Sequence, residues 1–87
     1  MKIIEKTMEM RGMRRTEIIN YFLSIAEENI GNWKFKGIGW EVIVDEESIA
    51  SIGRLQLPST NVTFRCDEKI IDEVIYAFRL KSLSAGG

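Results

Sequence analysis

The spacing of apolar residues changes period several times along this chain, and that change limits the folds it can adopt. Over residues 2–10 apolar and polar side chains alternate, which is the period of a strand with one buried face. Over residues 16–30 the apolar side chains recur at steps of three and four, as they do along an amphipathic helix. Alternation then returns, and a second helical stripe follows near the end. We therefore predict a domain of mixed helices and strands.

Both predicted helices carry recognisable end signals. Thr16 can cap the first helix, and Gly31 can adopt the left-handed conformation that ends it. Asp67 is a suitable cap for the second helix, and Glu68 complements its dipole. The second apolar stripe ends near Leu83, so we expect this helix to end there.

Between the helices, extended segments are predicted over residues 33–36, 40–44, 48–57 and 62–66. Gly37-Ile38-Gly39 predicts a tight turn between the first two. Gly53 interrupts the alternation of the third segment as a β-bulge would, with Leu55 and Leu57 facing inward. Residues 58–61, which begin with a proline, are expected to form the next turn.

The resulting order, β-α-β-β-β-β-α, predicts an α+β fold. Each helix has one apolar face, so both helices must cover the same face of the sheet. We expect a two-layer sandwich in which a five-stranded, mainly antiparallel sheet carries two helices on one face. Residues 1–83 form a single domain in this interpretation, and residues 84–87 form a flexible tail that ends in Gly86 and Gly87. The predicted core side chains are Ile18, Phe22, Leu23, Trp40, Val42, Phe64, Val74, Ile75 and Phe78.

Composition excludes several classes of function for this 87-residue chain. Twelve Lys and Arg residues oppose thirteen Asp and Glu residues, so the formal net charge is −1 and no strong field attracts nucleic acid or an anionic membrane. The absence of histidine removes imidazole catalysis and imidazole zinc ligands. The single cysteine, Cys66, cannot form an internal disulfide and suits a reducing compartment. We expect a cytoplasmic protein, not bound to a membrane, that is not an enzyme and holds no metal or cofactor.

The sheet face opposite the helices is the first candidate binding surface. By strand alternation it carries four cations and a glutamine, namely Lys34, Lys36, Arg54, Gln56 and Arg65. Cations among small polar residues can bind phosphate or nucleic acid. The neighbouring aromatic side chains all have the parity of the core, so this face has no stacking platform for bases. A solvated face, or one that binds a protein partner, is therefore favoured over nucleic-acid binding.

Cysteine and tryptophan each have a functional and a structural interpretation. Cys66 precedes the second helix, whose dipole can activate a thiolate, but without histidine we interpret it as a small buried hydrophobe. Trp33 and Trp40 share the core parity. One of them is expected at the rim of the core, because indole is rarely buried completely.

Gly86 and Gly87 also have two interpretations. Ubiquitin-like sulfur carriers end in two glycines because a tail without side chains can enter the narrow channel of an activating enzyme. The terminal carboxylate is adenylated there and then becomes a thiocarboxylate. Gly-rich chain ends are also common without such a role. The predicted element order favours this second interpretation, because β-grasp carriers place their main helix after a first hairpin.

Four segments carry a resemblance to a known family: Phe22-Leu23, Leu55-Gln56-Leu57-Pro58, Val62-Thr63-Phe64-Arg65 and Gly86-Gly87. With the element order, they make the chain similar to the C-terminal domain of MoaD-related proteins, a small module of TATA-binding-protein-like fold. In those proteins the module accompanies a ubiquitin-like domain that resembles the small subunit of molybdopterin synthase. The resemblance implies a non-enzymatic accessory or interaction module associated with molybdenum or tungsten cofactor biosynthesis.

We therefore expect a protein partner or a homodimer, formed through an edge strand or the open sheet face. Two other functions stay open. One is a carrier or modifier activated at the carboxylate of Gly87, for which Gly86 is also needed. The other is a domain that binds a small ligand or nucleic acid on the open sheet face.

Overall fold

The computed structural model describes residues 1–85, with side chains through residue 83. Its helices are α1 (Arg15–Ile25) and α2 (Ile71–Ala85). Its strands are β1 (Ile3–Arg11), β2 (Glu28–Ile30), β3 (Lys34–Gly37), β4 (Trp40–Val44), β5 (Ser48–Ile52) and β6 (Leu55–Asp67). The molecule is elongated, with principal extents of 45 × 23 × 21 Å.

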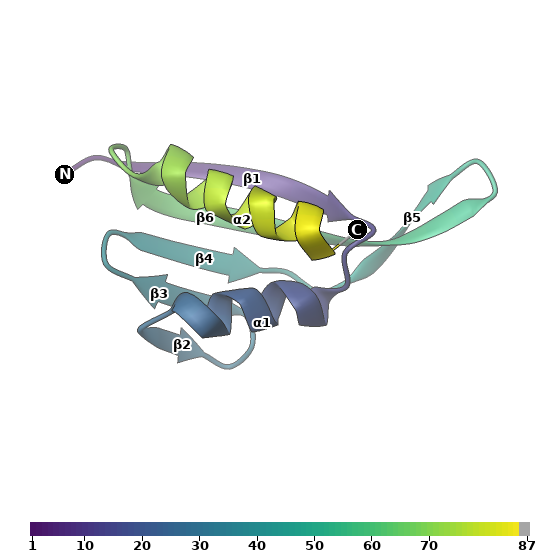
Figure 1. The fold of residues 1–87 in the computed structure, drawn as a ribbon, viewed down its shortest axis with the longest axis horizontal. Helices are drawn as coiled ribbons and strands as arrows, with labels where there is room; N and C mark the ends of the chain where they lie inside the picture. The colour runs from purple at the N-terminus through teal and green to yellow at the C-terminus, as the bar shows by residue number, and fades with distance from the viewer. Residues whose placement is uncertain (86–87) are drawn as a thin grey trace.

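The strand pairs of the sheet are all antiparallel, and the order across the sheet is β1-β6-β4-β3-β2. Both helices lie on one face, and β5 extends away from the main sheet as a hairpin with the first part of β6 (Figure 1). The α+β class and the antiparallel sheet are confirmed, and the first strand lies at an edge of the sheet. The described sheet has six strands instead of five, because residues 28–30 form β2.

Both helices are shorter at one end than the apolar spacing predicts. α1 ends at Ile25, although the helical period continues to Ile30. Residues 28–30 pair with β3 instead, so their backbone groups are satisfied by a neighbouring strand. α2 begins at Ile71 and not directly after Asp67, which is the last residue of β6. Sheet pairing takes residues 28–30 and Asp67, and residues 68–70 form a turn before α2.

For residues 48–61, the predicted bulge and the predicted turn are both wrong. Gly53 is not a bulge: its φ is +61°, and with Arg54 it forms the two-residue turn between β5 and β6. β6 then continues through residues 58–61, where a turn was expected. Leu55 and Leu57 do not face the core, and Leu55 is 57% exposed. A glycine in an alternating segment fits a bulge or a turn, so the pairing partner decides between them.

Aromatic rings form the centre of the core, between the helices and the sheet. Phe22 of α1 stacks on Phe78 of α2 with ring centroids 5.2 Å apart, and it meets Phe64 of β6 edge-on at 6.0 Å. The confirmed buried core residues are Ile18, Phe22, Val42, Phe64 and Phe78, with Trp40, Val74 and Ile75 half-buried against them. Leu23 was wrongly assigned to the core, because its side chain is exposed.

Candidate functional site

Charged side chains form a cross-strand row on the sheet face opposite the helices. The row consists of register partners on four neighbouring strands: Glu5, Arg65, Glu41 and Lys36. The Arg65 guanidinium lies 3.4 Å from the Glu5 carboxylate and 3.3 Å from the Glu41 carboxylate. Glu41 also pairs with Lys34 at 3.3 Å and with Lys36 at 3.8 Å. Three of the five residues predicted for a binding face thus surround one carboxylate.

This row is largely neutralised, which affects what the face can bind. Together with Lys34, the row has three cations and two carboxylates. Exposed ion pairs contribute little to stability, but each one weakens the field that an approaching phosphate experiences. The Thr7 and Thr63 hydroxyls, 2.9 Å apart, extend the same face with uncharged groups. The described face therefore attracts phosphate groups only weakly.

Arg54 and Gln56, the other two residues predicted for this face, lie on the hairpin that extends from the sheet (Figure 1). We call residues 48–58 the arm, which comprises β5 and the first part of β6. Within the described chain β5 pairs with β6 alone, so its outer edge is free. A two-stranded ribbon is marginally stable by itself in water. Large apolar side chains are nevertheless exposed on the arm: Ile49 by 70%, Ile52 by 50% and Leu55 by 57%.

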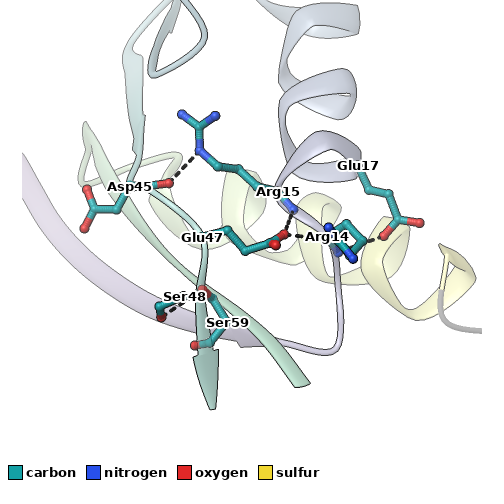
Figure 2. Close-up of polar contacts among 7 residues, drawn as sticks. All are labelled: Arg14, Arg15, Glu17, Asp45, Glu47, Ser48 and Ser59. Atoms are coloured by element: carbon teal, nitrogen blue, oxygen red, sulfur yellow. Dashed lines mark hydrogen bonds and ion pairs between the residues drawn. The ribbon is translucent and has the colours of Figure 1, made fainter. Parts of the chain in front are cut away.

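The base of the arm is tied to the start of α1 (Figure 2). The Glu47 carboxylate accepts the backbone N–H of Arg15 at 2.9 Å and lies 3.3 Å from the Arg14 guanidinium. The Arg15 guanidinium donates to the Asp45 carbonyl at 2.7 Å. An anion at a helix N-terminus is favourable, because the first backbone N–H groups have no partner within the helix. These contacts help begin α1 at Arg15, with Arg14 as its N-cap. The predicted Thr16 cap is wrong, because Thr16 lies within the first turn of the helix.

An open groove lies between β1 and α2 on the helix side of the sheet. Two adjoining hollows of 660 and 530 Å³ share Met8, Tyr76 and Arg79 in their walls. An ion pair of 3.3 Å between Lys6 and Asp72 borders the first hollow. We call the two hollows together the β1–α2 groove. The groove follows β1, which has a strand neighbour on one side only.

The β1–α2 groove combines apolar and cationic groups beside an open strand edge. Tyr76 and Leu83 are exposed in it, and Met8 is half-buried. Arg79 forms no ion pair with any side chain of residues 1–83. An extended segment can add to such an edge through main-chain hydrogen bonds while its side chains enter the groove. The unpaired guanidinium favours a segment that carries a carboxylate.

The other chemistry-bearing residues have structural positions. Cys66 is fully buried, as predicted, and burial raises the pKa of its thiol. Trp33 is exposed at the rim while Trp40 is half-buried, which confirms the expectation that one indole lies at the rim. Residues 1–83 contain no group of three or more acidic or Cys side chains that could hold a metal ion. No helix within residues 1–85 is long and apolar enough to cross a membrane.

Sequence reasoning missed both the β1–α2 groove and the arm. Tyr76 and Arg79 have the spacing of an outward helix face, and the linear pattern does not show that this face borders β1. The arm did leave a signal, because Arg54 is the only charged residue between Ser48 and Phe64. A long uncharged segment outside the core indicates a surface that something else covers.

The predicted tail is only partly within the described residues. α2 includes residues 84 and 85, the first half of that tail. Gly86 and Gly87, the two residues proposed for chemical activation, lie outside the described residues.

The fold and its surfaces define a class of protein: a small α+β domain with an antiparallel sheet, two helices on one face, and exposed edges at β1 and β5. The family model described as "Archaeal MoaD-like protein" matches residues 6–87, and the chain belongs to that family. The predicted relation to MoaD-related proteins is thereby confirmed. Comparisons with curated proteins and with solved structures gave no match.

Proposed function

We propose that this protein is a non-enzymatic accessory protein of molybdenum or tungsten cofactor biosynthesis, which acts in the cytoplasm by binding another protein. The observation that carries the proposal is the element order of a MoaD-like chain. α1 follows a single strand, and that strand pairs antiparallel with β6. A β-grasp carrier places its main helix after a first hairpin. A chain with a different order is suited to work beside such a carrier and not as one.

The proposed partner is a ubiquitin-like protein of the molybdopterin synthase small-subunit type, and the β1–α2 groove is its binding surface. Carriers of this type end in an extended Gly-Gly tail with a free carboxylate. An extended tail without side chains can pair with the outer edge of β1. Its carboxylate then comes to the Arg79 guanidinium, which has no acidic partner among the described side chains.

Calorimetric titration with the purified molybdopterin synthase small subunit of the same organism tests this proposal. A hydrogen bond to a charged group contributes about 1.5–3 kcal/mol, so Arg79→Glu should weaken binding by about tenfold or more. Removing the two terminal glycines of the small subunit should cause a similar loss. Arg54→Glu makes the same charge change on the arm and should leave the affinity unchanged. Absence of binding, or an equal loss with both variants, contradicts the proposal.

A second candidate function is that this chain is itself a carrier activated at Gly87. The family match favours it, because that match extends through Gly86 and Gly87. Intact-mass analysis of protein from native cells would then show the increase that accompanies replacement of one carboxylate oxygen by sulfur. Deleting both glycines should abolish carrier function under this alternative, and it should leave groove binding unchanged under the first proposal.

A further inference from the structure

The arm presents a strand edge that is compatible with a copy of itself. β5 pairs with β6 only, and its other edge is open within the described chain. Ile49 and Ile52 are among its exposed side chains, and no residue of β5 is charged. An uncharged, unpaired edge with exposed apolar side chains is a template for another strand. Proteins commonly cover such an edge with another segment. The backbone hydrogen bonds and the charges of the arm indicate which segment pairs with it.

We propose that two copies of this chain form a dimer through antiparallel pairing of β5 with β5, centred on Ala50. The two arms then join into one sheet with the order β6-β5-β5-β6. The two-fold axis passes between the two Ala50 residues, so both copies use the same surface. This inference goes beyond the proposed function and does not depend on it, because it concerns the arm and not the β1–α2 groove.

The hydrogen bonds of β6 show which backbone groups of β5 face outward. The Pro58 carbonyl accepts the Gly12 N–H at 2.8 Å, on the side of β6 away from β5. Pro58 is the register partner of Ile49, so these two residues are not hydrogen-bonded to each other. Because bonded and non-bonded pairs alternate along an antiparallel ladder, Ile49 and Ser51 direct their N–H and C=O groups to the free edge. Pairing about Ala50 places Ile49 opposite Ser51 of the second copy, so these groups meet.

Charges that flank β5 are complementary in the same register. Arg54 is in the turn that follows β5 and Glu46 lies just before β5, so antiparallel pairing brings the Arg54 end of one arm beside the Glu46 end of the other. Neither forms an ion pair with any side chain of residues 1–83. Pairing about Ala50 gives each of the five β5 residues a partner, whereas a register shifted by two residues leaves part of each strand unpaired. The overlap of the two strands therefore selects the register about Ala50, and the complementary charges at the two ends of β5 identify a second copy as the occupant.

The expected dimer is weak and depends on concentration. Each large side chain of β5 lies opposite a small one, Ile49 opposite Ser51 and Ile52 opposite Ser48, so the two strands approach without steric conflict. Five-residue strands nevertheless bury less than the roughly 1,200–2,000 Å² of a standard stable interface. We expect dissociation constants in the micromolar range.

Sedimentation equilibrium from micromolar to millimolar concentrations tests the pairing. Wild type should associate to a dimer, and Arg54→Glu and Glu46→Arg should each weaken the dimer by about tenfold, because each homodimer then opposes like charges twice. A mixture of the two variants should regain the affinity, since both contacts of the mixed dimer join opposite charges. Both side chains are exposed, so unchanged circular dichroism and melting temperature confirm that the variants remain folded.

A cysteine on the axis provides a second test. Ala50→Cys places two thiols in a non-hydrogen-bonded pair, where Cα atoms lie about 4.5 Å apart and a disulfide can form. Ile52→Cys is the matched control, because residue 52 lies opposite Ser48 and not opposite itself. Native Cys66 is fully buried and cannot interfere. Mild oxidation should yield a covalent dimer of the first variant only.

Three results would overturn the inference: a wild-type monomer throughout the concentration range, equal cross-linking of both cysteine variants, or no recovery in the mixture of charge variants. A hydrogen-exchange measurement could also overturn it. If the β5 amides become protected only when the molybdopterin synthase small subunit is added, the arm binds that protein and not a second copy.

Discussion

β1 and β5 are both exposed edges of one sheet, but they differ in charge and in what lies beside them (Figure 1). β1 has nine residues, among them Glu5, Lys6, Glu9 and Arg11, and α2 lies alongside it. β5 has five residues without a charge, and it lies beyond the two helices. Charged side chains make an edge costly to pair unless the incoming strand matches them, whereas an uncharged edge accepts its own copy. Exposure alone therefore does not define the partner of an edge; its charges do.

The two regions also differ in how they are held. β1 pairs with β6 along its whole length, and the core beneath α2 lies directly beside that pair. The arm is held by its own hairpin and by the Glu47 contacts at its base. Substitutions in the body should therefore change stability, while substitutions in the arm should change association.

Phe78→Ala should give the largest effect, because it removes a fully buried ring that stacks on Phe22. Loss of such a ring costs about 3–5 kcal/mol of unfolding free energy, measurable by urea denaturation. Leu55→Ala on the arm should cost less than about 0.5 kcal/mol, because the Leu55 side chain is largely exposed. A Leu55→Ala variant as unstable as Phe78→Ala would mean that the arm packs against the body, and the comparison would fail.

Gly37→Ala should give the second largest effect. A Cβ at Gly37 would overlap the indole of Trp40, which packs against Phe22 in the core. Overpacking of this kind costs about 1–3 kcal/mol. Gly53→Ala is the counterpart on the arm, where a Cβ meets open space but the left-handed φ costs about 1–2 kcal/mol locally. Hydrogen exchange should show global loosening for Gly37→Ala and loosening confined to β5 for Gly53→Ala.

Glu47→Ala and Glu46→Ala should separate the base of the arm from its interface. Removing the Glu47 carboxylate leaves Glu17 as the remaining acidic group at the N-terminus of α1 and should cost about 1 kcal/mol. Glu46→Ala should leave the melting temperature unchanged but weaken the dimer, because Glu46 contacts only the second copy in the proposed register. If Glu46→Ala lowers the melting temperature as much as Glu47→Ala, that division of roles is wrong.

The smallest expected effect concerns the charges of the β1 edge. Hydrogen bonds from Arg11, at 3.1 Å, and from the Ser59 hydroxyl, at 2.6 Å, hold the pKa of Glu9 below its usual value. A lowered folded-state pKa stabilises the fold above the unfolded-state pKa, and this contribution is lost as the pH falls through the folded value. Glu9→Gln should therefore lower the melting temperature slightly at neutral pH. The difference from wild type should disappear in acid, and a difference that persists there would refute the assignment.

The apolar periods alone were sufficient for the parts of the fold that local spacing determines. α1, α2, β1 and the turn at Gly37-Ile38-Gly39 lie where the pattern predicts them, within a few residues. Phe22, Phe64 and Phe78 are buried, because each lies on the apolar side of its helix or strand and that side must pack against another element. The resemblance to MoaD-related proteins was also readable from the chain and is confirmed by the family match.

In the arm, the pairing of β5 with β6 determined which residues form strands and which form the turn. Pro58 suggests a turn, yet it lies within β6. The nitrogen of Pro58 faces the side of β6 where β1 ends, so the lack of an N–H there removes no hydrogen bond between strands. The Pro58 carbonyl on the same side accepts the Gly12 N–H. Gly53 likewise lies in a hairpin turn, because residues 48–52 pair with residues 55–59 of the same chain.

The sequence by itself determined the fold class, the family, most of the core and the face on which Lys34, Lys36 and Arg65 lie. Only the tertiary structure decided what those cations can do, because strand register brings Glu41 between them and leaves little free charge for a ligand. The groove beside Arg79 and the free edge of the arm were decided in the same way. Alternation and helical period are local properties of the chain, whereas register and helix docking join residues far apart in sequence, and no local pattern records them.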